Sequence, residues 1–403
     1  MERIRSVSRR ALLSLGALTV LLLQTGCPST RAPRGMQATS LHEAMQPFSP
    51  EERLNVGIEI FSPGDTSPAA LEEQTTNEQI RKAETHFIPM HLKNTLDASN
   101  YWGEIRVVPP GARGVDLIVR GEILRSNGVE LRVRIEAEDS QGYTWLTRTY
   151  SEAGRTRGFQ EAQTAAVDPF QNLYNAIAND LAAVRRRMDG FEVKTLRRST
   201  EMAFAAEIVP EAFGEYIRRT PDGKLEVVRL PAEDDPTWRR VEQISVRNEM
   251  FYDALHASFE PFYLGLWPSY LEWRSSNLVE QTAIRNANRQ GLQQAAAGIV
   301  MIATAILLEV NDARGSSTLR DVLILGGTQV IINGVNVSQR TEFHEAALQE
   351  LADSFGTEAR TTVVELEGQT VQLTGTVEEQ MTQWREMLRR LHAAETGRPG
   401  DAP

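Results

Sequence analysis

Cysteine is almost absent from this chain of 403 residues, in which Cys27 is the single thiol. Without a second cysteine no disulfide can form within the chain, and zinc sites built from several thiolates are excluded. Histidine is also scarce. The six histidines are His42, His86, His91, His256, His344 and His392. No two of them have the i, i+4 spacing of a helical zinc site, so we expect surface or capping histidines and no bound metal.

The short motifs of the common enzyme classes are missing as well. The chain has no G-x-S-x-G nucleophile elbow, no Walker loop and no dinucleotide fingerprint. Asp and Glu are plentiful, but no pattern pairs two of them as acid and base. We therefore predict a protein that is not an enzyme and holds no cofactor. A hydrolase with an unrecognised acidic or histidine site in the aromatic region is kept as an alternative.

The chain has fewer positively than negatively charged residues. Lys and Arg number 43 against 54 Asp and Glu, which gives a formal net charge of −11. The remaining composition, with 41% hydrophobic and 24% charged residues, is that of an ordinary globular protein. Nucleic-acid binding needs clustered Lys and Arg, so nucleic acid is excluded as a partner, and neutral or basic partners are expected.

No apolar run reaches the roughly 20 residues that span a bilayer comfortably. The apolar run near the N-terminus, Ala11 to Leu23, follows Arg3, Arg5, Arg9 and Arg10 and ends just before a small residue, Gly26. This order predicts a secretory signal peptide over residues 1–26. Ser8-Arg9-Arg10 also resembles a twin-arginine export signal. Export through Sec is favoured over that second route.

Cys27 lies directly after the predicted signal peptide. The stretch Thr25-Gly26-Cys27 resembles a lipobox, although Gln24 stands where such motifs have Leu or another apolar residue. The resemblance implies that Cys27 carries diacylglycerol and palmitate, and two or more acyl chains give stable membrane anchoring. Pro28 follows in place of an Asp retention signal, which favours the periplasmic face of the outer membrane. The alternative is a secreted protein with an incidental cysteine.

Residues 27–52 are rich in Pro, Ser and Thr and predict a flexible tether. An α/β domain is predicted over residues 53–188. Its expected elements are a strand at 54–61, a helix at 76–99, strands at 101–108, 115–124, 129–138 and 143–150, and a helix at 170–188. Ser126-Asn127-Gly128 predicts a hairpin with a type I′ turn, because Asn-Gly accepts positive φ. Apolar and charged residues then alternate from Leu131 to Ala137, as in a half-buried antiparallel strand.

This β-α-β-β-β-α order has a counterpart in known envelope domains. With its stretches "VDLIVRGEIL", which contains Gly121, and "EDSQGYTWL", it resembles the N-terminal domain of TolB and the periplasmic domain of CsgG-like lipoproteins. The resemblance covers about residues 54–188 and implies a domain for protein–protein contact. It carries no catalytic motif, and a fold does not fix a function.

Residues 189–245 are expected to form a connector. Its hairpin has arms at 213–219 and 224–230 around the turn Thr220-Pro221-Asp222-Gly223. The acidic loop at 232–236 is expected to cap the next helix rather than to bind a cation.

Residues 246–395 are expected to be mainly helical. The stretch 248–288 is rich in aromatics, and Pro261 and Pro268 predict kinks or a division into two short helices. The aromatics are Phe251, Tyr252, Phe259, Phe262, Tyr263, Trp267, Tyr270 and Trp273. Aromatics at helical spacing favour core packing over a ligand groove or a protein or membrane contact.

Two apolar stretches follow, Ala295–Val310 and Val322–Val337. They favour a buried helical hairpin over a membrane-inserting or oligomer-forming one, which their small residues would also allow. The remaining expected elements are a helix at 339–354, strands at 361–367 and 370–376, a helix at 378–392 and a disordered tail at 396–403. The stretch "VVELEGQTVQLTGTVEEQ" resembles the central hairpin of a BON-type envelope domain.

Together these patterns predict an α+β fold in a lipid-anchored protein of the cell envelope. The favoured role is a non-catalytic interaction or assembly module at the outer membrane, with other envelope proteins as partners. The alternative is a CsgG-like oligomeric secretion or pore component, in which the hairpin at 295–337 enters or lines a membrane.

Overall fold

The fold is taken from a computed structural model. It describes residues 38–46, 48–74, 76–155, 158–159, 167–232, 234–309, 361–366 and 369–395. The signal segment, Cys27, residues 310–360 and the tail at 396–403 lie outside the described residues, so what is predicted for them stays a prediction.

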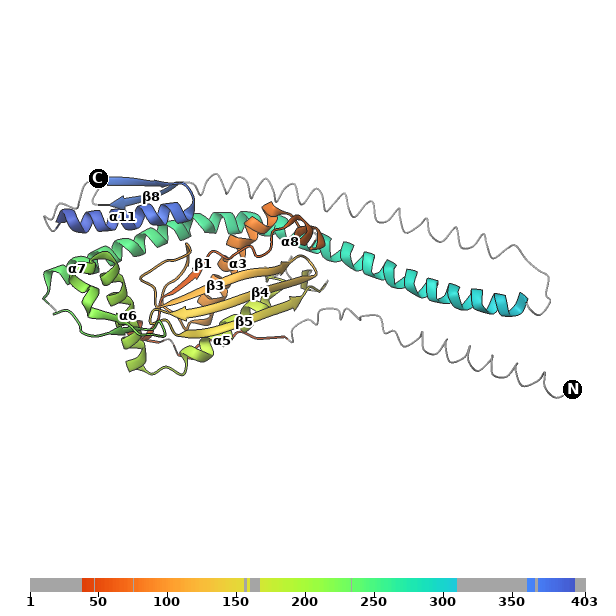
Figure 1. Ribbon diagram of the computed structural model, residues 1–403, viewed down its shortest axis with the longest axis horizontal. Helices are drawn as coiled ribbons and strands as arrows, with labels where there is room; N and C mark the ends of the chain where they lie inside the picture. The colour runs from red at the N-terminus through yellow and green to blue at the C-terminus, as the bar shows by residue number, and fades with distance from the viewer. Residues whose placement is uncertain are drawn as a thin grey trace. The chain divides into compact units, whose positions relative to one another are not determined.

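A five-stranded mixed sheet forms the centre of the α/β domain (Figure 1). Its strands are β1 (Val56–Glu59), β2 (Ile105–Val108), β3 (Leu117–Ser126), β4 (Glu130–Asp139) and β5 (Thr144–Ala153). They lie in the order β2-β1-β3-β4-β5, and β1 runs parallel to both of its neighbours. The other pairs are antiparallel. The α+β class is confirmed, and each of the five strands expected from the sequence is present, so the order β-α-β-β-β-α is one strand short.

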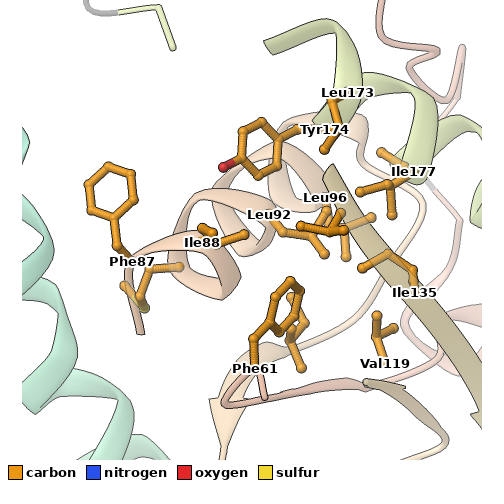
Figure 2. Close-up of a cluster of buried hydrophobic side chains, with 14 of the residues drawn as sticks. Phe61, Phe87, Ile88, Leu92, Leu96, Val119, Ile135, Leu173, Tyr174 and Ile177 are labelled. Carbon is orange, nitrogen blue, oxygen red and sulfur yellow. The ribbon is translucent and has the colours of Figure 1, made fainter. Parts of the chain in front are cut away.

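Strand β4 has one buried and one exposed face, which matches the alternation of apolar and charged residues in its sequence. Leu131, Val133, Ile135 and Ala137 are fully buried, whereas Arg132 and Arg134 are exposed. The buried side is covered by α3 (Glu78–Ser99) and α5 (Gln171–Arg185). Figure 2 shows side chains of both helices gathered over the sheet, among them Ile88, Leu92, Leu96, Leu173 and Ile177 with Val119 and Ile135.

The hairpin between β3 and β4 is confirmed, but its predicted type I′ turn is wrong. Neither Asn127 nor Gly128 has a positive φ. Instead the Asn127 side-chain oxygen accepts hydrogen bonds from the backbone N–H groups of Val129 and Glu130, both at 2.9 Å. Glycine is required at 128 for a different reason: a Cβ there would lie 1.7 Å from the carbonyl oxygen of Arg274.

The segment predicted as a connector contains a long helix that the sequence pattern did not reveal. This helix, α6 (Gly190–Ile208), follows α5 and is capped by Asp189; the short helix α2 (Pro68–Glu73) belongs to the first domain. It is followed by α7 (Pro210–Phe213). The predicted hairpin is present with shorter arms, β6 (Ile217–Arg219) and β7 (Leu225–Val227).

Helix α8 (Pro236–Glu309) is continuous over 74 residues, and its side chains are described as far as residue 282, except at 280. The predicted acidic cap is confirmed, because the Asp235 carboxylate accepts the N–H of Thr237 at 2.8 Å. Of the two outcomes expected at Pro261 and Pro268, the division into two short helices is wrong, because α8 continues through both prolines. Both prolines are on the exposed face, where water can satisfy the carbonyls that they leave without a donor.

The aromatic residues of α8 pack into the core, as predicted. The buried ones are Phe251, Tyr252, Phe259, Phe262, Tyr263, Tyr270 and Trp273. Trp267 is half-buried. They bring α8 against α3, so this long helix is part of the domain rather than a separate module.

The predicted C-terminal unit is confirmed as β8 (Thr361–Leu366), β9 (Gln369–Thr374) and α11 (Val377–Glu395), which Figure 1 shows beside α8. It shares a second core with α6 and α8. The Trp384 ring stacks on Phe251 with centroids 4.9 Å apart. In the part of the chain that the structure describes, no helix is long and apolar enough to cross a membrane.

The described part of the predicted tether lies on the body. Leu41, Ala44 and Phe48 pack against the first core, and a short 3-10 turn (Pro50–Glu52) precedes β1. The guanidinium of Arg185 lies over the Phe48 ring, 4.4 Å from its centroid. Because few residues make this contact, the sequence has no apolar periodicity here that would predict it.

Candidate functional site

A cleft of about 860 Å³ opens at the carboxyl end of β1. Its walls are the residues that follow β1, the first half of α3 and the start of α11. The strand order turns at β1, because β2 lies on one side and β3, the next strand along the chain, on the other. The crevice outside such a strand end is where ligands bind in many sheets with parallel strands.

The floor of the cleft is apolar. Phe61, only 2% exposed, follows β1 and covers Gly121 in the middle of β3. A Cβ at Gly121 would lie 2.4 Å from the Phe61 ring. Glycine at this position therefore lets the ring lie directly against the strand, and Ile60, Pro63 and Ala83 continue the apolar lining.

One buried carboxylate lies on this floor. Glu59, 8% exposed, accepts the backbone N–H of Gly111 at 3.0 Å, and its other oxygen lies 3.6 Å from Nε of Arg120. The burial cost of the charge is thus offset by a donor and a cation.

The rim is formed by charged residues on two helices. Glu78 and Lys82 of α3 and Glu378 and Glu379 of α11 are exposed there. Glu379 has a structural role, because its carboxylate accepts the N–H of Thr376 at 2.8 Å and caps α11.

His86 is the titratable ring in the wall of the cleft. It is half-buried, with its centroid 5.4 Å from that of Phe259. Its Nδ1 lies 3.0 Å from the hydroxyl of Thr85. Burial lowers the pKa of His86 to about 4, against smaller opposing effects of the Lys82 carbonyl and the Glu378 charge. The ring is therefore neutral at pH 7.

The expectation of surface or capping histidines fails at two positions. His91 and His392 are buried, at 7% and 6% exposure. The ring nitrogens of His91 lie 2.7 Å from the Tyr263 hydroxyl and 2.8 Å from the Gln171 amide oxygen, so partners on two other helices compensate its burial. His256 is half-buried and His42 is exposed, whereas His344 lies outside the described residues.

The hydrolase alternative requires a cleft in which His, Asp or Glu converge, and this cleft does bring Glu59, His86 and Glu378 to one cavity. The hydroxyl beside His86, that of Thr85, donates to the Lys82 carbonyl at 2.7 Å. It is thus not aligned as a nucleophile that gives its proton to the ring. Within the described residues no group of three or more His, Cys, Asp or Glu could hold a metal ion.

Sequence patterns did not single out the residues of this cleft. A glycine inside a strand, Gly121, and a Ser-Pro-Gly segment after the first strand were the available signals for a close approach. Cys27, the single site residue predicted, lies outside the described residues.

Comparison with protein-family models, curated proteins and solved structures finds no match for this chain, so its function is inferred from its own residues.

Proposed function

We propose that the protein is a lipid-anchored interaction module of the cell envelope. Cys27 carries the acyl chains on the periplasmic face of the outer membrane, and the folded body binds another envelope component without chemical turnover. The signal-like segment before Cys27 supports the anchor, and the cleft at the end of β1 supports the binding role.

The observation that carries the binding role is the make-up of the cleft. An apolar floor with a few polar groups at its edge is typical of ligand sites. Two of its carboxylates already have partners within the protein, Glu59 with Arg120 and Glu379 with the start of α11.

The charge of the cleft indicates the class of partner. Four carboxylates line it, those of Glu59, Glu78, Glu378 and Glu379, against the two cations Lys82 and Arg120. The whole chain is acidic too, with a net charge of −11. A peptide segment with an apolar side chain next to Lys or Arg matches both the floor and the rim.

Replacing the thiol tests the anchor. The Cys27→Ser chain should move from the membrane fraction to the soluble fraction, because it cannot be acylated. It should also lose incorporation of a palmitate analogue, whereas the neighbouring Ser29→Ala change should leave both readouts as in the parent. A Cys27→Ser chain that stays in the membrane fraction contradicts lipid anchoring.

Charge reversal at the rim tests the cleft. Peptides with an apolar residue flanked by Lys or Arg should bind the Cys27→Ser chain in fluorescence anisotropy, and their acidic counterparts should not. Glu378→Lys should weaken this binding several-fold. Glu386→Lys, an exposed change further along α11 and outside the cleft lining, is the matched control. Equal binding of basic and acidic peptides would show that the proposed partner class is wrong.

A further inference from the structure

Three asparagines form a row along α5. Asn172, Asn175 and Asn179 are spaced three and four residues apart, which places them on one face of the helix. All three are half-buried under the segment 39–42, which comes before the folded domain in the chain.

Four hydrogen bonds join the asparagine amides to the main chain of the segment. The Thr39 N–H donates to Asn172 at 2.8 Å, and Asn175 donates to the Thr39 carbonyl at 2.7 Å. Asn179 makes two bonds: it accepts the His42 N–H at 2.7 Å and donates to the Ser40 carbonyl at 2.9 Å. A side-chain amide has the same donor and acceptor as a peptide group, so the row acts like the edge of a strand.

The row is held in place from behind. The Asn172 amide also donates to the buried Glu152 at 2.8 Å, and Gln171 donates to the Asn175 oxygen at 2.9 Å. Gln171 in turn contacts His91 at 2.8 Å. Because these partners fix which way the amides of Asn172 and Asn175 point, these two present donors and acceptors before the segment binds.

We propose that the asparagine row of α5 is a binding site for an extended polypeptide main chain, filled by this chain's own residues 39–42. We call the bound segment the strap. Leu41, packed against the core, gives it one apolar anchor. The side chains of Ser40 and His42 are exposed, so the site recognises their peptide groups and not their identity.

The strap sets how far the body can stand from the membrane, a consequence that rests on the proposed anchor at Cys27. Twelve residues, Pro28 to Thr39, separate the anchor from the row and span at most about 43 Å. With the strap released, the next contact with the body is that of Ala44, so 17 residues, Pro28 to Ala44, span up to about 61 Å. The row therefore shortens the greatest distance between the anchor and the body by roughly a third.

Hydrogen exchange on the soluble Cys27→Ser chain tests the site. Asn179→Ala removes two bonds and should speed amide exchange in residues 39–42 roughly tenfold. Exchange in β4 should be unchanged, which would show that the domain stays folded. The control Gln243→Ala removes an exposed amide from α8, away from the strap, and should have no effect.

Side-chain changes in the strap complete the test. Ser40→Val and His42→Val should leave exchange of the strap as in the parent, since only main-chain groups are bound. Unchanged exchange in Asn179→Ala overturns the proposal, and so does a Ser40→Val or His42→Val chain that exchanges as fast as Asn179→Ala. These readouts do not involve the membrane, so a failed anchor at Cys27 would leave them intact.

Discussion

At the scale of the single residue, buried charge is the feature that sets the energetics of this domain. Arg274 of α8 is 1% exposed and lies 3.2 Å from Asp168, which is 3% exposed. Its guanidinium also lies over the Tyr270 ring, 4.0 Å from the centroid. A charge removed from water in this way is tolerated only because both kinds of partner are present.

Removing the cation should therefore be costly. Arg274→Ala leaves Asp168 buried without its counter-ion and should lower the free energy of unfolding by about 3–5 kcal/mol. Chemical denaturation measures this loss. Arg390→Ala, an exposed pair with Glu386, should change stability by less than about 0.5 kcal/mol. A similar small effect at Arg274 would mean that the pair contributes nothing to the fold.

Histidine burial makes stability depend on pH. Burial lowers the pKa of His86 to about 4, and it lowers the pKa of His91 and His256 as well. In the unfolded chain these rings titrate near 6.5, so between pH 6.5 and the lowered pKa of each ring, about 4 for His86, the unfolded state binds more protons than the folded state. The free energy of unfolding consequently falls as the pH drops through this window.

His86→Gln should flatten this pH dependence. Urea denaturation of the variant and the parent at pH 7 and pH 5 gives the difference, and the variant should lose less stability at pH 5. Buried carboxylates such as Asp116, whose pKa burial raises, act on both chains alike and cancel in the comparison. His42→Gln, at an exposed position, is the control. Parallel pH profiles for His86→Gln and the parent would contradict the prediction.

At the scale of the element, glycines at 128 and 265 have opposite roles although neither has a positive φ. A Cβ at Gly128 would meet backbone of α8, whereas a Cβ at Gly265, within α8, would meet nothing within 4 Å. One glycine therefore permits a contact between the β3–β4 hairpin and the long helix. The other only leaves α8 with a residue of low helix propensity.

Alanine should separate these two roles. Gly128→Ala should lower the melting temperature sharply and cost about 3 kcal/mol or more, since backbone on both sides must shift. Gly265→Ala should stabilise the protein by about 1 kcal/mol. Thermal unfolding followed by circular dichroism measures both. Loss of stability in Gly265→Ala would mean that another group packs against that face of α8. A Gly128→Ala chain of unchanged stability would show that the hairpin and α8 are not in close contact.

The elements that sequence patterns predicted were those with apolar residues on one side and polar or charged residues on the other. Strand β4 alternates apolar and charged residues, and it was placed within one residue. Helix α6 was missed because its inner side includes hydroxyls. Thr200 donates to Asp116 at 2.6 Å, and Ser199 accepts from the Gln141 amide at 2.9 Å. In a sequence such polar residues indicate a surface position, but here hydrogen bonds within the protein allow them to be buried.

At the scale of the whole molecule, the cleft is assembled from segments far apart in the chain. Phe61 and Gly121 come from the sheet, and the rim residues Thr376 to Glu379 come from the start of α11. Each segment was expected in its own element, but nothing in the sequence indicated that they meet. The contact depends on the second core, which joins α11 to α6 and α8. Propensity and periodicity report on neighbours in the chain and not on this packing.

Trp384 is the residue on which this assembly should depend. It is fully buried, stacks on Phe251 and donates its indole N–H to Asn248 at 3.2 Å. Trp384→Ala removes the stacking and leaves a cavity, which should cost about 3–5 kcal/mol in the second core. Because that core holds α11 over the cleft, the loss should fall on the C-terminal unit before the five-stranded sheet.

Hydrogen exchange distinguishes a local from a global effect of this change. In Trp384→Ala, exchange should speed up in β8, β9 and α11 while β3 and β4 keep their protection, and binding of basic peptides to the cleft should weaken with it. Arg389→Ala, an exposed change on the same helix, should alter neither. If peptide binding survives when the C-terminal unit has lost its protection, the rim from α11 is not part of the site, and the binding surface must lie on the sheet and α3 alone.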